Sequence, residues 1–143
     1  MANIPKVKIM VFGTFDILHK GHENFFKQAR KLSRHPFLIV SVARDVNVKK
    51  IKGKLPVYRQ AVRLANIKKS KLVNKAVLAG LANHLPHIIK EKPAIVALGY
   101  DQKAYTKDLE KDLKKLGITV IITRLKPFLP KKYKSSLLGG KLL

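Results

Sequence analysis

Short apolar runs alternate with longer amphipathic stretches along this chain. Five runs of mainly apolar residues predict buried strands, at residues 6–12, 37–43, 75–78, 94–98 and 118–123. Five stretches with helical spacing of apolar residues predict helices, at residues 22–32, 57–68, 83–90, 106–116 and 135–142. Strands that are apolar along their whole length, separated by helices, are typical of a parallel sheet covered on both faces. The pattern therefore predicts an α/β fold.

Ligands of an open parallel sheet bind beyond the carboxyl ends of its strands, where the strand order reverses. Four segments that directly follow predicted strands carry unusual residue clusters, at 13–22, 44–54, 99–102 and 124–136. Two of these segments contain expected basic loops, KKIKGK at 49–54 and PFLPKKYK at 127–134. Function is therefore expected at this edge of the sheet.

The first of these segments, GTFDILHKGH, combines two glycines with two histidines. Gly13 allows a sharp turn after the strand, and Gly21 allows another chain or ligand to approach the backbone at the start of the helix. His19 and His22 lie three residues apart and can both donate a hydrogen bond to one phosphate at the helix N-terminus. Asp16 beside them is a candidate to orient a histidine or to approach a metal. The same pattern also suits a turn that only caps the helix, or a histidine pair that binds stray metal ions.

Composition narrows the class of protein. The chain has 143 residues, of which 46% are hydrophobic and 27% charged, so it can bury a core and is not a disordered basic tail. Cysteine is absent, which excludes a disulfide framework, a thiolate zinc site and a thiol nucleophile. No apolar run approaches the ~18 residues of a membrane helix, and the N-terminus lacks a signal-peptide layout. We expect a cytoplasmic protein with no membrane span.

The charge balance limits the partners. With 31 Lys and Arg against 8 Asp and Glu, the formal net charge is +23. A surplus of this size attracts polyanions such as nucleic acid, anionic lipid or a nucleoside triphosphate. The alternative is a lysine-rich solvated surface without a dedicated partner, because net charge determines solubility and steering rather than the reaction.

Residues 11–22 resemble the GTFD-x-x-H-x-GH signature of the cytidylyltransferase-like nucleotidyltransferases, which include archaeal-type FAD synthases and glycerol-3-phosphate cytidylyltransferases. The resemblance extends over roughly residues 7–138, through the segments 41–45, 52–54 and 98–102 and the residues Arg63, Ser135 and Ser136. The chain departs from the family pattern at Asn74, where an acidic residue is common. It also lacks the C-terminal Arg-x-x-Gly-Ile-Ser-Thr-Thr string of cytidylyltransferases.

This resemblance implies nucleotidyl transfer, in which an acceptor phosphate attacks the α-phosphorus of a nucleoside triphosphate and pyrophosphate leaves. It implies that His19 and His22 stabilise charge on the α-phosphate. Lys52, with Lys49 or Lys50 as alternatives, would bridge the attacking phosphate and the triphosphate. Arg63 would reach the β- or γ-phosphate or the acceptor.

The remaining site residues are implied in nucleotide binding. Phosphate oxygens would lie against the first turn, at Gly13, Thr14, Phe15 and Gly21. Ribose and base would contact the segment after the fourth strand, at Gly99, Tyr100, Asp101 and Gln102. Ser135 and Ser136 would hold the departing pyrophosphate. Mg²⁺ would arrive with the triphosphate, with Asp16 as the one candidate protein ligand.

The combined prediction is a single Rossmann-like α/β domain over residues 1–143, with a basic C-terminal loop and short tail at 124–143. Its five-stranded parallel sheet has the order 3-2-1-4-5, with helices on both faces. The predicted reaction is adenylyl transfer from ATP to FMN, giving FAD. One alternative is a CTP-dependent enzyme acting on glycerol-3-phosphate or a similar phosphorylated alcohol. A second is a non-catalytic protein that binds nucleic acid or another polyanion. Homodimerisation is expected from the family.

Overall fold

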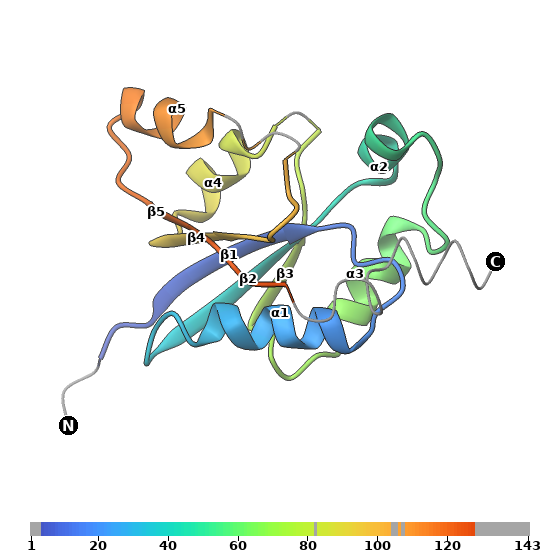
Figure 1. The fold of residues 1–143 in the computed structure, drawn as a ribbon, viewed down its shortest axis with the longest axis horizontal. Coiled ribbons are helices and arrows are strands. Elements are labelled where there is room, and N and C mark those ends of the chain that lie inside the picture. Colours follow the sequence, from blue (N-terminus) through green and yellow to red (C-terminus); the bar gives the residue numbers. More distant parts are fainter. Residues whose placement is uncertain (1–3, 82, 104–105, 107, 128–143) are drawn as a thin grey trace.

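The computed structural model describes residues 4–81, 83–103, 106 and 108–127 (Figure 1). The five strands are β1 (Val7–Gly13), β2 (Pro36–Val42), β3 (Lys75–Leu78), β4 (Ile95–Leu98) and β5 (Ile121–Arg124). The helices are α1 (Lys20–Arg30), α2 (Asp45–Lys52), α3 (Gln60–Lys68), α4 (Leu85–Glu91) and α5 (Leu109–Lys115). Within the described ranges, no helix is long and apolar enough to cross a membrane.

All neighbouring strands of the sheet are parallel, in the order β3-β2-β1-β4-β5. The predicted fold class and strand order are therefore confirmed. The chain runs outward from β1 to β3 on one side and returns to β4 and β5 on the other. The strand order consequently reverses between β1 and β4, which is where a parallel sheet opens a crevice for ligands.

Alternate residues of β1 pack on opposite faces of the sheet. Ile9 and Val11 belong to the cluster under α1 and α3, which contains Phe26 and Ile67. Met10 and Phe12 belong to the cluster under α4 and α5. Figure 1 shows α1 and α3 on one side of the sheet and α4 and α5 on the other. Burial on both faces explains why the strands read as continuous apolar runs.

The segment after β2 differs from the prediction, because α2 stands where a basic loop was expected. Asp45 lies in the first turn of α2 and Lys52 in the last, so both complement the helix dipole. Gly53, with φ of 81°, ends the helix in the left-handed conformation that glycine adopts without strain. The high lysine content suggested a loop, but buried Val48 anchors the helix. The helix predicted at 135–142 lies outside the described residues.

Candidate active site

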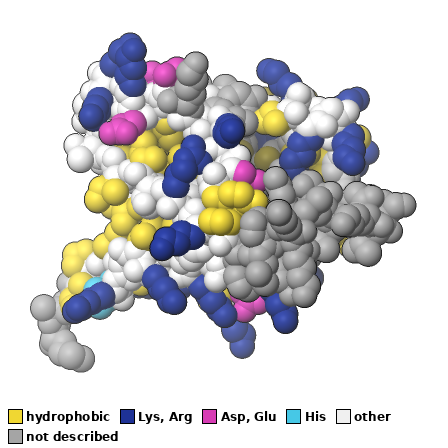
Figure 2. Space-filling view, in the orientation of Figure 1, with side chains coloured by type: hydrophobic (Ala, Val, Ile, Leu, Met, Phe, Trp, Pro, Cys, Tyr) yellow, Lys and Arg dark blue, Asp and Glu magenta, His cyan; other side chains and the backbone are white. Residues whose placement is uncertain are grey.

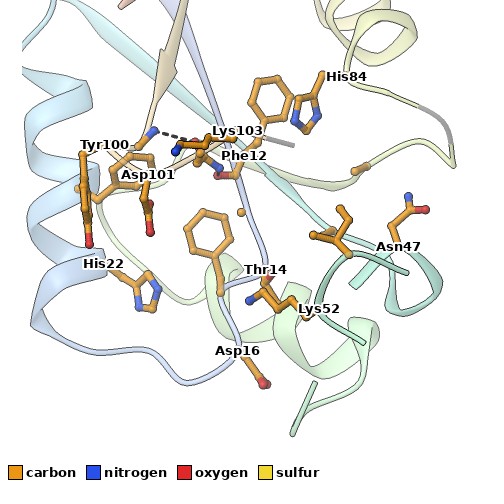
Figure 3. A pocket seen from close by; sticks show the side chains of 18 of the residues that line it. Phe12, Thr14, Asp16, His22, Asn47, Lys52, His84, Tyr100, Asp101 and Lys103 are labelled. Atoms are coloured by element: carbon orange, nitrogen blue, oxygen red, sulfur yellow. Dashed lines mark hydrogen bonds between the residues drawn. The ribbon is translucent and has the colours of Figure 1, made fainter. Parts of the chain in front are cut away.

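A cleft of about 800 Å³ opens at the carboxyl ends of β1 and β4 (Figure 3). It brings together most of the residues that the sequence singled out: Gly13, Thr14, Phe15, Asp16, His19, Gly21, His22, Lys52, Gly99, Tyr100, Asp101 and Gln102. Ser135 and Ser136 lie outside the described residues. Segments distant in the sequence thus meet at the predicted edge of the sheet.

The side chains of the two histidines cap the N-terminus of α1 by accepting hydrogen bonds from backbone N–H groups. His19 is the N-cap residue, and its Nδ1 accepts a hydrogen bond from the backbone N–H of Gly21 at 3.0 Å. The backbone N–H of His19 donates to Nδ1 of His22 at 3.3 Å. The His-x-Gly-His motif therefore forms a capping box, a reciprocal arrangement more often built from Ser or Thr with Glu or Gln.

This cap determines the tautomer of both histidines. A neutral imidazole has one nitrogen that accepts and one that carries hydrogen. Because Nδ1 accepts in His19 and in His22, the hydrogen of each neutral ring is on Nε2. The ring centroids are 4.1 Å apart, so the two Nε2–H donors can act on one anion.

Electrostatics keep these rings neutral. Burial, and then the charges of His19 and Lys52, lower the pKa of His22 to about 3. Burial also lowers the pKa of His19. At neutral pH the pair therefore presents hydrogen-bond donors rather than two full positive charges.

The lowered pKa of His22 makes the fold sensitive to acid. Unfolded histidine titrates near 6.5, so between pH 6.5 and about pH 3 the unfolded chain takes up a proton that folded His22 does not. The free energy of unfolding therefore falls as the pH is lowered through this range, by up to about 2 kcal/mol from His22 between pH 6.5 and 4.5. Urea unfolding at several pH values measures this slope.

His22→Asn is the matched control, because asparagine keeps an acceptor near the Nδ1 position and does not titrate. It should flatten the pH dependence between pH 6.5 and 4.5. His19 and His87, whose pKa values burial also lowers, remain to give a residual slope. An unchanged slope in His22→Asn would contradict the assignment to His22.

Phe15 packs against the histidine turn. Its side chain is buried and packs edge-on against His22, with ring centroids 5.6 Å apart. Its φ of 53° lies in the left-handed region, which is costly for a non-glycine residue and recurs at functional sites. A Cβ on Gly13 would lie 2.6 Å from Cζ of Phe15, so only glycine fits there. Phe15 therefore positions the turn, and its ring belongs to the core.

Asp16 ties the histidine turn to the loop before α3. Its Oδ2 accepts from the backbone N–H of Val57 at 2.7 Å, and its Oδ1 from that of Tyr58 at 2.8 Å. Among the described residues, no group of three or more His, Asp or Glu side chains is placed to hold a metal ion. The side chains present therefore do not form a resident metal site around Asp16.

Arg63 lies elsewhere than predicted. Its side chain is fully buried, and it is not among the described residues that line the cleft. Nε donates to the carbonyl of Tyr58 at 2.9 Å and Nη1 to that of Thr14 at 2.8 Å. Nη2 donates to the carboxylate of Asp45 at 2.7 Å. These hydrogen bonds make Arg63 a clamp between the histidine turn and the start of α2, and its contact with phosphate stays a prediction.

Gln102 closes the loop after β4. Its Oε1 accepts from the N–H of Gly99 at 2.7 Å, and its Nε2 donates to the carbonyl of Phe12 at 2.6 Å. Arg124 donates to the carbonyls of Gly99 and Gln102, both at 2.8 Å. Gln102 and Arg124 thus shape this loop, while Tyr100 and Asp101 stand at the cleft (Figure 3).

The segment after β3 also belongs to the site, although the sequence analysis did not predict it. Ala79, Gly80, Asn83 and His84 line the cleft. Figure 3 shows His84 and Tyr100 well apart in it. The signal was available, because this segment also follows a strand of the parallel sheet.

The parallel sheet brings two histidines to the reversal of its strand order, the arrangement expected for an enzyme of the nucleotidyltransferase type. Residues 10–138 match the family model described as Cytidylyltransferase-like. The chain belongs to the cytidylyltransferase-like family.

Named relatives cover most of the chain. It is 39% identical over 122 residues to the FAD synthase of Thermoplasma volcanium, covering 85% of this chain and 84% of the relative. It is 40% identical over 134 residues to the FAD synthase of Aciduliprofundum boonei, covering 94% and 85%. A solved structure of a lipopolysaccharide core biosynthesis protein from Thermoplasma volcanium superposes with a TM-score of 0.79 at 39% identity. That similarity covers 87% of this chain and 99% of the solved one.

Proposed function

We propose that this protein transfers the adenylyl group of ATP to FMN, giving FAD and pyrophosphate. The observation that carries the proposal is the pair of neutral Nε2–H donors of His19 and His22, two residues that line the cleft. The relatives named FAD synthase, at 32–40% identity, indicate which nucleotide and which acceptor fill the two sides.

We assign two lobes to the cleft, one at Tyr100 and one at His84, which lie apart in Figure 3. The nucleotide lobe lies at the end of β4 and is lined by Gly99, Tyr100, Asp101 and Lys103. The acceptor lobe lies between α2 and the segment after β3 and is lined by Asn47, Ile51, Ala79, Gly80 and His84. A triphosphate whose base occupies the nucleotide lobe has its α-phosphate at the histidines, facing the acceptor lobe.

The proposed chemical step is a direct displacement. A phosphate oxygen of FMN forms a bond to the α-phosphorus of ATP, and the bond from that phosphorus to the bridging oxygen breaks. The electron pair leaves with pyrophosphate. His19 and His22 donate hydrogen bonds to the α-phosphate oxygens as charge shifts toward the leaving group, and this stabilisation is already oriented by the cap. No covalent enzyme intermediate is needed.

Mg²⁺ is proposed to enter with the triphosphate. Both carboxylate oxygens of Asp16 accept backbone hydrogen bonds, so this side chain does not present an open ligand set. When bound, the ion neutralises phosphate charge and helps pyrophosphate to leave. The cytoplasmic location and the homodimer stay predictions.

Lys52 is the proposed bridge between the two phosphates. It lines the cleft at the end of α2, and its charge is close enough to lower the pKa of His22. We expect Lys52→Ala to lower kcat/KM about 100-fold, the effect of removing one donor of developing charge. Lys111→Ala, which removes an exposed lysine on α5 away from the cleft, is the matched control. Equal effects in steady-state kinetics would assign the loss to general electrostatics.

Pyrophosphate release tests the function. ATP and CTP are each combined with FMN, glycerol-3-phosphate or phosphocholine in the presence of Mg²⁺. Turnover with ATP and FMN, with FAD as product, supports the proposal. Turnover only with CTP and a phosphorylated alcohol would overturn the substrate assignment and leave the histidine chemistry in place.

Polyanion binding is the second candidate, carried by the net charge of +23. Figure 2 shows lysine and arginine side chains distributed over one face, with few acidic side chains among them. A steep loss of DNA affinity from low to physiological salt, without turnover in any substrate pair, would favour this function.

A further inference from the structure

An aromatic wall closes the acceptor lobe. The imidazole of His84 stacks on the ring of Phe12, with centroids 4.0 Å apart and planes inclined by 23° (Figure 3). Phe12 is only 3% exposed and His84 is partly exposed, and both residues line the cleft. Phe12 is held within β1, and His84 directly precedes α4, with a proline in its first turn. Two stacked rings on regular elements form a rigid plane.

The surroundings of this plane are small and apolar. Ala79 and Gly80 line the lobe beside it, and a Cβ on Gly80 would meet nothing within 4 Å. The amide of Asn47 donates to the carbonyl of Gly80 at 3.1 Å and holds that segment against α2. Ile51 adds an exposed apolar side chain from the same helix. An open space bounded by an aromatic plane and aliphatic groups suits a flat heterocycle better than a small polyol.

We propose that the Phe12–His84 stack is the platform for the isoalloxazine ring of FMN, and that His84 determines acceptor specificity. The inference rests on the proposed function, because it assumes that the acceptor is a flavin phosphate. The ATP base lies at the opposite end of the cleft, beside Tyr100, since the α-phosphate must stand at the histidines between the two lobes. A planar ring on His84 leaves the flavin phosphate directed toward Lys52, which also lines the cleft.

FMN fluorescence tests the platform. The chain contains no tryptophan, so the flavin emission reports binding directly. His84→Ala should raise the Kd of FMN about tenfold, the effect of losing one stacking partner. The KM for FMN should rise similarly, while the KM for ATP stays within about twofold of wild type. His84→Phe restores the flat surface and should bind FMN nearly as tightly as wild type.

His35→Ala is the matched control, because it removes an exposed histidine that is not part of the cleft. Wild-type FMN affinity in His84→Ala would overturn the platform. A rise in the KM for ATP with an unchanged KM for FMN would also overturn it, because that result would place adenine on His84. These results are separable from failure of the proposed function. If wild type binds FMN through His84 but forms no FAD, the reaction assignment fails and the platform stands. If His84→Ala forms FAD with an unchanged KM for FMN, the platform fails and the reaction assignment stands.

Discussion

His22→Ala is expected to lower kcat about 1,000-fold at pH 7.5. The substitution removes the Nε2–H that we propose donates to the α-phosphate, and losing one preorganised donor of this kind costs about 100- to 1,000-fold. It also removes the acceptor that caps the backbone N–H of His19. The expected size of the loss therefore lies at the upper end of the range.

Two amide variants separate these roles. His22→Asn keeps an acceptor near Nδ1 but has no donor at Nε2, so it should unfold at a wild-type urea concentration and remain inactive. His22→Gln places its amide nitrogen near Nε2 and loses the cap, so it should retain part of the activity and lose about 1 kcal/mol of stability. Single-turnover formation of pyrophosphate and urea unfolding measure the two effects. An active His22→Asn would contradict donation from Nε2.

The fold was predictable because its strands are buried on both faces. Residues of β1 and β2 pack alternately under two helix layers, and this accounts for the short, continuous apolar runs in the sequence. The edge that carries function followed from the parallel arrangement, and most of the site residues named from the sequence line one cleft there.

The orientation of side chains was not predictable in the same way. Serine, threonine, aspartate and asparagine are the usual N-cap residues, so a histidine cap at His19 gives no familiar sequence signal. The lysines of α2 suggested a loop, although Val48 and Gly53 mark a helix and its end. The stacking of His84 on Phe12 joins residues 72 positions apart and depends on the tertiary fold. An arginine on a helix is usually solvated, so the burial of Arg63 could not be predicted from the sequence.

Arg63→Met is expected to destabilise the protein by about 3–5 kcal/mol and to lower its melting temperature by roughly 10 °C. Methionine fills a similar volume but leaves the carboxylate of Asp45 and the carbonyls of Thr14 and Tyr58 without their donors. Burial favours the neutral form of Asp45, while hydrogen bonds from Arg63 and Gln60 and nearby charges outweigh it and lower its pKa. Loss of Arg63 therefore removes the ion-pair partner of Asp45 and leaves the Gln60 hydrogen bond and the charge of Arg59.

The kinetic signature distinguishes a clamp from a phosphate ligand. Arg63 holds the backbone of Thr14, just before the histidine turn, and the first residue of α2, which carries Lys52 at its other end. Below its melting temperature, Arg63→Met should therefore lose kcat about tenfold or more, while the KM for ATP changes little. Arg59→Met, which removes an exposed guanidinium at the start of α3, is the matched control and should stay close to wild type.

Coupling to Asp45 completes the test of Arg63. If the guanidinium acts through this carboxylate, Asp45→Asn and Arg63→Met should be strongly non-additive in urea unfolding, because each removes the same ion pair. A phosphate ligand would instead show additive stabilities and a raised KM for ATP in Arg63→Met at wild-type stability. That result would return Arg63 to the phosphate-binding role that its position in the sequence suggested. The non-additive result would explain why an arginine without access to the cleft is required for the reaction there.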